Sequence, residues 1–158
     1  MSYGKLLGAG TAVALVIATA GFAGSHAVKS SNATVAARHN QMQMVGYHIG
    51  VLGAVAKGEM AYDAAMVEAA AKNLAALATM ERATLWAEGT EQGAADLSRA
   101  KAEIWQEPDA FAAKFKALEE ASLAMVGAAD AAAVGAAMGP LGGACKGCHE
   151  QFRGPKIE

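Results

Sequence analysis

The stretch Cys145-Lys-Gly-Cys148-His149 decides what this chain of 158 residues can be. Its spacing, C-x-x-C-H, is that of the covalent attachment site of a c-type haem. Two thiols three residues apart on one helical turn can each form a thioether with a haem vinyl group, and the adjacent histidine can bind the iron. A disulfide, half of a zinc site and a thioredoxin-like pair are the alternatives. Zinc needs two further ligands, and a thioredoxin-like motif follows a strand, so we expect haem c.

The composition favours an all-α fold around this motif. Apolar residues make up 54% of the chain and charged residues 18%, which excludes a disordered protein. Much of the apolar fraction is alanine, a strong helix former and a weak strand former. With only 6% aromatic residues, the core has space that a large flat cofactor can fill. A formal charge of -2 gives no basic surface for nucleic acid, and two cysteines cannot build a disulfide scaffold.

The N-terminal segment, residues 1–27, has the pattern of a cleaved signal peptide. Lys5 is followed by an apolar stretch over residues 11–20, and Ser25-His-Ala27 has the small-x-small form of a cleavage site. An uncleaved membrane anchor is the alternative, because the uncharged stretch is just long enough to span a bilayer. Cleavage leaves one domain, residues 28–158, exported to the periplasm and without stable insertion in the membrane.

Caps and stop signals predict four helices in the mature domain. They are expected from Ser30 or Ser31 to Lys57-Gly58, from Asp63 through Leu85 towards Gly89, from Pro108 to Gly127, and from Asp130 to Arg153 with a kink at Pro140. The economical architecture is an antiparallel, up-down four-helix bundle that encloses one covalently bound haem.

The first predicted helix carries one buried stripe. Its residues recur at steps of three and four, and they are Val35, Arg38, Met42, Val45, Ile49, Leu52 and Ala56. Only Arg38 interrupts the apolar pattern. His39 and His48 fall off the stripe and are expected at the surface.

Several segments together resemble the class II cytochromes c, the cytochrome c prime family. They are Gly143 to Arg153, Ala54 to Glu59, Tyr62 to Ala65, and Glu103 to Trp105. The resemblance implies a four-helix fold with His149 as the proximal iron ligand. It also implies Arg153 near the exposed haem edge and Arg38 as a partner of a haem propionate. The alternative for Arg38 is a side chain that extends from the edge of the stripe to solvent.

The residue opposite His149 decides the function that the resemblance implies. Most members of the family leave that side to an apolar residue and bind small gases, whereas a low-spin subgroup supplies methionine and carries electrons. Met42 lies one turn after Arg38, at the distal position, while Met44 lies roughly 200° round the helix. The alternative for Met42 is a core methionine that fills a gap.

With Met42 bound, the protein is a single-electron carrier with redox proteins as partners, and no catalytic residue is required. Without it, the protein binds NO or CO at five-coordinate iron. A catalytic haem protein needs a distal acid-base pair, which the off-stripe His39 and His48 do not supply. A homodimer through the first two helices is also expected from the resemblance, since Gly46, Gly50 and Gly53 permit close helix contact.

Overall fold

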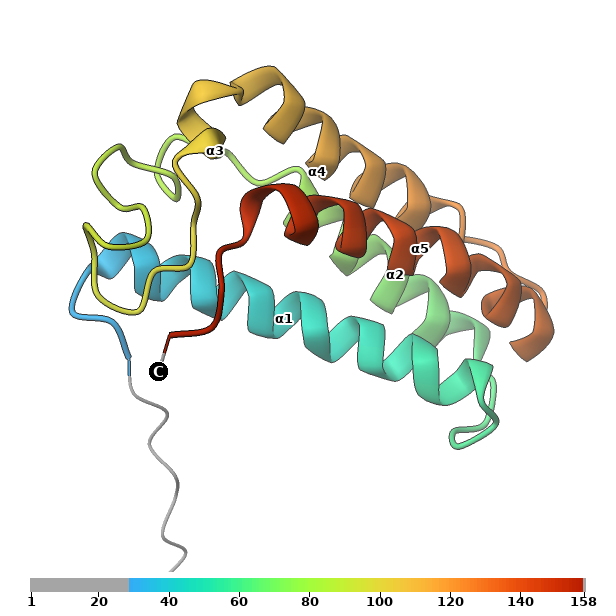
Figure 1. The fold of residues 1–158 in the computed structure, drawn as a ribbon. Helices are drawn as coiled ribbons and strands as arrows, with labels where there is room; N and C mark the ends of the chain where they lie inside the picture. Colours follow the sequence, from blue (N-terminus) through green and yellow to red (C-terminus); the bar gives the residue numbers. More distant parts are fainter. Residues whose placement is uncertain (1–28, 158) are drawn as a thin grey trace, which may run out of the picture.

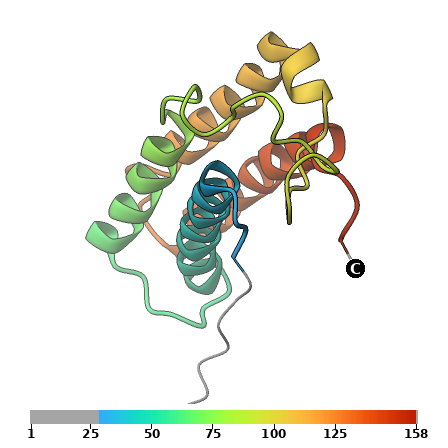
Figure 2. The same cartoon turned by 90° about the vertical axis from the view of Figure 1, so that its left-hand side faces the viewer.

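The computed structural model describes residues 29–157 as a bundle of helices. They are α1 (Ala33–Ala56), α2 (Ala64–Ala78), the short α3 (Glu103–Gln106), α4 (Pro108–Leu123) and α5 (Ala131–Phe152). The four long helices run up and down, and each packs against two others (Figures 1 and 2). The predicted four-helix bundle is confirmed. No helix within residues 29–157 is long and apolar enough to cross a membrane. The predicted signal peptide lies outside the described residues.

Side-chain caps fix where the long helices begin. The carboxylate of Asp63 accepts from Met66 N at 2.7 Å, and that of Asp130 accepts from Ala133 N at 2.8 Å. Both residues are the predicted starts, and each such cap stabilises its helix by about 1 kcal/mol. Helix α1 instead begins after Asn32, whose side chain accepts from the backbone of the first turn. The prediction of Ser30 or Ser31 as the cap is therefore wrong, because both of these serines bond to Asp96.

Helix α2 ends at Ala78, about three turns before the predicted end near Gly89. The hydroxyl of Thr79 donates to the carbonyls of Ala75 and Ala76 at 3.2 and 3.1 Å, which occupies acceptors that a continuing helix would use. The following residues form an irregular segment that we call loop 79–102. Its Leu85 is buried although it is not helical.

Helix α4 also stops short of the prediction, at Leu123 instead of Gly127. The backbone N–H of Met125 bonds to Ser122 O at 3.1 Å, so the chain tightens into turns before Gly127, whose φ is +81°. Helix α5 runs without a break through Pro140. A proline inside a helix costs about 3 kcal/mol, which the packing of α5 against α1 and α4 has to offset.

The buried face of α1 is rotated about the helix axis relative to the predicted stripe. Val35, Arg38, Val45 and Leu52 are buried as expected, but the turns between them bury Gln41, His48 and Val55. The amide of Gln41 donates to Leu77 O at 2.8 Å, which directs this edge of α1 towards α2. The prediction of His48 at the surface is wrong, since only 6% of it is exposed. His39 is half-buried.

An aromatic cluster fills the end of the bundle where α5 finishes. The ring of Phe111 meets Trp86, Phe115 and Phe152 edge to face, with centroids 4.8, 5.2 and 5.1 Å away. Such pairs contribute about 1 kcal/mol each beyond the area they bury. Because the rest of the core is largely aliphatic and alanine-rich, the aromatic residues are concentrated beside the haem motif.

Loop 79–102 is joined to both ends of the described chain. The carboxylate of Asp96 accepts from the hydroxyl of Ser30 at 2.6 Å and from the backbone N–H of Ser31 at 2.8 Å. Further along, Gly154 N donates to Arg99 O at 2.7 Å, and the N–H of Lys101 donates to the carbonyl that precedes Arg153. The loop is therefore ordered by the segments that precede α1 and follow α5.

The contacts of Asp96 predict a pH dependence of stability. Hydrogen bonds from Ser30 and Ser31 lower the pKa of Asp96 from 3.8 to about 2. A lowered folded-state pKa stabilises the fold above the unfolded value, and this contribution disappears as the pH falls from about 4 to about 2. We expect Asp96→Asn to unfold at a lower temperature than the parent at pH 6, with the difference shrinking towards pH 2. Thermal unfolding followed by circular dichroism measures this difference, with Glu59→Gln at the far end of the bundle as the control. An equal difference at both pH values would contradict the prediction.

Candidate haem-binding site

Both cysteines of the motif lie on the inward face of α5. Cys145 and Cys148 are half-buried, pack against the core and form no disulfide. They continue a stripe whose other members, Leu141 and Phe152, are buried. The predicted placement of two thiols on one helical turn is therefore what the structure has, and both thiols face the interior of the bundle.

Electrostatics at the motif keep its three side chains neutral. Burial raises the pKa of the Cys145 and Cys148 thiols, and Lys114 and Arg153 oppose part of the rise at Cys148. Burial also lowers the pKa of His149, and nearby Arg153 and Arg99 lower it further. The His149 imidazole is thus uncharged at neutral pH, which is the form that donates a nitrogen lone pair to iron.

Helix α1 faces this motif across the bundle, and the two helices diverge there. At the far end they are in contact, since a Cβ built on Gly53 would lie 3.8 Å from Met138 Cε and one on Gly135 would lie 4.0 Å from Ala56 Cβ. Towards the start of α1 and the end of α5 the ribbons move apart (Figures 1 and 2). Met42 lies on this diverging part of α1.

The burial of Met42 differs from that of its neighbours on the predicted stripe. Met42 is half-buried and does not pack against the hydrophobic core, whereas Ile49 and Ala56 do. Met44 is 48% exposed. Half-buried thiols on α5 and a half-buried thioether on α1, placed where the two helices diverge, fit a large apolar group between them. The residues present therefore suit a haem held from α5.

Arg38 is buried and bound to loop 79–102. Its guanidinium donates to Thr90 Oγ1 at 2.8 Å, to Thr90 O at 2.9 Å and to Ser98 Oγ at 3.3 Å, and it lies 4.7 Å from the ring centre of Trp86. Burial lowers the pKa of the Arg38 guanidinium below its usual value. Sequence reasoning missed Thr90, Ser98 and Trp86. The only signal for them was the charge of Arg38 itself, which needs acceptors once it is buried.

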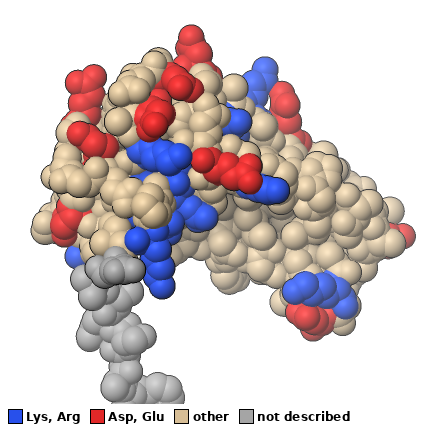
Figure 3. Space-filling view, viewed as in Figure 1, with Lys and Arg blue, Asp and Glu red and all other residues tan. Residues whose placement is uncertain are grey.

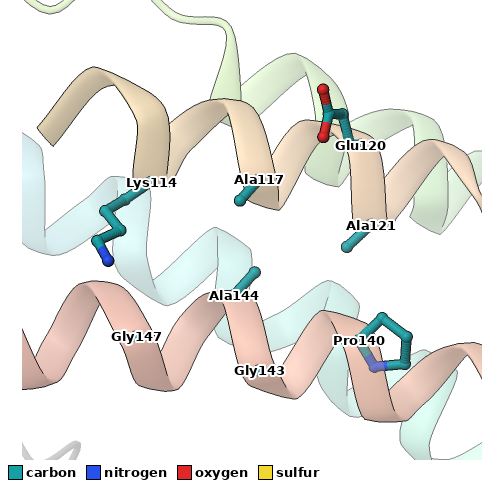
Figure 4. Close-up of a pocket in the computed structure, with 8 residues that line it drawn as sticks. All are labelled: Lys114, Ala117, Glu120, Ala121, Pro140, Gly143, Ala144 and Gly147. Atoms are coloured by element: carbon teal, nitrogen blue, oxygen red, sulfur yellow. The ribbon is translucent and has the colours of Figure 1, made fainter. Parts of the chain in front are cut away.

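Arg153 is exposed and caps α5, where its backbone N–H donates to His149 O at 3.1 Å. Arg99 and Lys114 also act on the motif, and sequence reasoning did not single them out. Lys114 reaches α5 from α4, with its Nζ 3.9 Å from a Cβ built on Gly147. It borders an open groove between α4 and α5 that neither cysteine lines (Figure 4).

Known proteins match this chain over nearly all the described residues. The family model described as cytochrome C' matches residues 33–153. The cytochrome c' of Cereibacter sphaeroides is 43% identical over 121 residues, which are 75% of this chain and 81% of that protein. The cytochrome c-554 of the same organism is 42% identical over 118 residues, 73% of this chain and 77% of that one.

Solved structures agree with these sequence matches. A cytochrome c' from Rhodobacter spheriodes is similar with a TM-score of 0.72 and 41% identity, over 78% of this chain and 96% of that one. A cytochrome c' described by its ligand-controlled dimer dissociation has a TM-score of 0.60 and 32% identity, over 77% and 95%. With the helical C-x-x-C-H motif, the four-helix bundle and these matches together, the chain belongs to the cytochrome c' family, class II of the c-type cytochromes.

Proposed function

We propose that this protein carries single electrons through one haem c, with His149 and Met42 as the axial ligands. Proteins of the cytochrome c' family are haem proteins that bind haem c covalently, and the two cysteines of this chain are Cys145 and Cys148. The bound haem supplies iron that gains or loses one electron. The residues of the chain hold the haem, set its ligands and limit access to it.

The observation that carries the proposal is the position of Met42. Its side chain is half-buried, lies outside the hydrophobic core and occurs one turn after the buried Arg38. A core methionine would pack against the core, as Met138 does. A thioether ligand favours reduced iron, and a filled sixth position leaves no open site for a gas. Little then rearranges when the electron moves.

Arg38 and Arg153 complete the proposed site. Three hydrogen bonds from the Arg38 guanidinium go to loop 79–102, and a guanidinium has five N–H donors, so donors remain for a haem propionate. Arg153 stands on the surface at the end of α5. We propose that it lies at the exposed haem edge, where the electron enters and leaves.

We propose that the protein acts in the periplasm after cleavage of residues 1–27. The support is the signal-like pattern of that segment and the C-x-x-C-H motif, because c-type haem is attached after translocation.

A second copy of the chain is the proposed partner of α1 and α2. The outward side of α1 carries no Asp, Glu, Lys or Arg, and its Met44 and Tyr47 are 48% and 63% exposed. In Figure 3 the surface over the middle of α1 is nearly free of charge. A Cβ built on Gly46 or Gly50 meets no atom within 4 Å, so another helix can approach the backbone there.

Met42→Ala tests the axial ligand. If the thioether binds iron, the variant changes the reduced spectrum from sharp, resolved α and β bands to a broad high-spin spectrum that shifts with carbon monoxide. Met44→Ala is the matched control and leaves the low-spin spectrum unchanged. Absorption spectra of oxidised and dithionite-reduced protein, with and without carbon monoxide, measure this. A parent protein that is already high-spin and binds the gas would support the five-coordinate alternative. The cytochrome c' and the cytochrome c-554 of Cereibacter sphaeroides match the chain about equally, so this spectrum is the measurement that separates the two alternatives.

Replacing both thiols tests the attachment. We expect Cys145→Ala/Cys148→Ala, expressed with the haem-attachment machinery, to lack covalent haem, because no other cysteine is present in the chain. Mass spectrometry after extraction with acidified acetone measures the bound haem, with the parent as the control. The mass of the parent protein in the same spectra identifies its first residue after cleavage. Haem retained in the double variant would contradict the assignment.

Tyr47→Glu tests the homodimer. A carboxylate on each copy places like charges on the contact, so we expect the dimer to weaken by roughly tenfold or more in its dissociation constant. Glu119→Gln on α4 serves as a control away from α1 and α2. Sedimentation equilibrium measures both variants, and a parent that stays monomeric at high concentration would refute the dimer.

A further inference from the structure

Unpaired cations gather around the end of α5, although the whole chain has a formal charge of -2. We call them the cationic rim, and its members are Arg99, Lys101, Lys114, Arg153 and Lys156. None of them forms an ion pair within the described residues. Elsewhere, by contrast, Lys57, Lys72 and Lys116 each pair with a glutamate. Figure 3 shows the blue side chains collected where α5 ends and the C-terminal segment passes loop 79–102.

The backbone holds three members of the rim together. Ala100 and Arg153 form an antiparallel bridge, and the hydrogen bond from Gly154 N to Arg99 O lies beside it. The guanidinium of Arg99 donates to Gly154 O at 2.7 and 3.0 Å, and Lys101 Nζ donates to Glu150 O at 3.3 Å. These hydrogen bonds hold the three cations beside one another at the end of α5.

The rim borders the haem motif itself. The backbone N–H of Arg153 donates to His149 O at 3.1 Å, so Arg153 directly follows the motif. Lys114 Nζ lies 3.9 Å from a Cβ built on Gly147, the residue before Cys148. A molecule that approaches the end of α5 therefore meets these cations.

Carboxylates also lie near the rim, and each has a different neighbour. Glu150 lies 3.7 Å from Lys146 Nζ, a cation outside the rim, and Glu107 accepts from the side-chain amide of Gln151 at 2.8 Å. Glu103 in α3 is half-buried. Within the described residues none of these carboxylates forms an ion pair with a rim cation, so the positive side chains of the rim stay free to meet carboxylates of a partner.

We propose that the cationic rim is the docking surface for the acidic surface of a redox partner protein. This inference rests on the proposed electron-carrier function and adds the chemistry of the partner. A partner with a basic surface is repelled at the rim. A partner with carboxylates on its surface is attracted there, which brings its redox centre to the end of α5. One electron then passes between the two centres, and no bond forms or breaks. Steering of this kind raises association rates by about tenfold to a thousandfold at low salt.

Oxidation of the reduced holoprotein by two small reagents tests the sign of the local charge. Hexacyanoferrate(III) is an anionic one-electron oxidant and tris(phenanthroline)cobalt(III) a cationic one. We expect the rate with the anion to fall about tenfold when the ionic strength rises from about 0.01 to 0.15 M, because the screening length shortens from about 30 to about 8 Å. The rate with the cation should rise or stay constant. The charge-reversed Lys101→Glu/Lys156→Glu should remove this preference, while the matched control Lys57→Glu/Lys72→Glu, away from α5, should keep it.

A protein probe and a lipid probe then identify the kind of partner. Reduced plant-type ferredoxin, an acidic protein, should reduce the oxidised parent at a rate that falls with salt and falls about tenfold in Lys101→Glu/Lys156→Glu. In a co-sedimentation assay at 0.15 M salt, the parent should stay in the supernatant when phosphatidylglycerol vesicles are pelleted. Haem spectra of every variant confirm that it is folded.

Each result bears on one of the two proposals. Rates that follow the sign of the whole-chain charge, or an unchanged double variant, would overturn the docking surface while leaving the electron carrier intact. Vesicle binding that needs the rim, with a ferredoxin rate insensitive to salt, would assign the rim to membrane lipid instead. Failure of the holoprotein to exchange electrons with either reagent would overturn the carrier function, and the docking proposal with it.

Discussion

The divergence of α1 from α5 is the constraint on which the site depends. The helices touch at Gly53 and Gly135, where the absence of side chains permits close approach, and their ribbons separate towards the start of α1 and the end of α5 (Figure 2). Four helices packed tightly along their whole length would leave no volume for a cofactor. A bundle whose helices are close at one end and further apart at the other can hold both a close-packed core and a cofactor. In the proposed holoprotein the haem would lie at the end where α1 and α5 are further apart.

Loop 79–102 covers the end of the bundle that carries the haem motif. Arg38 binds it from α1, the Trp86 ring lies under that guanidinium, and the C-terminal segment pairs with its last residues. A buried arginine without acceptors would cost several kcal/mol, so the loop and the helix require each other. The same contacts bring cations to the motif. In the proposed holoprotein, support of the fold, the environment of the haem and the charge at the docking surface would therefore come from one set of residues.

The sequence sufficed for features set by local chemistry. The caps Asp63 and Asp130, the start at Pro108 and the placement of both thiols on one helical turn all follow from short-range rules, and the structure has each of them. Features set by distant contacts were not predictable in the same way. The serines before α1 bond to Asp96, 65 residues away, so an equally good cap, Asn32, takes their place. His48 is polar and was placed outside, yet the turn of α1 towards α2 buries it.

The hydrogen bonds between Arg99 and Gly154 also affect which part of the fold unfolds locally first. This contact closes a span of 55 residues with a few hydrogen bonds near the surface, whereas the helices are held by continuous apolar faces. Long closures cost more chain entropy, and segments with few buried contacts open before the core does. Such fluctuations would release a cofactor that is held only by packing. Thioether bonds on α5 make the cofactor part of the chain, so the weakest region of the fold can fray and reclose without losing it.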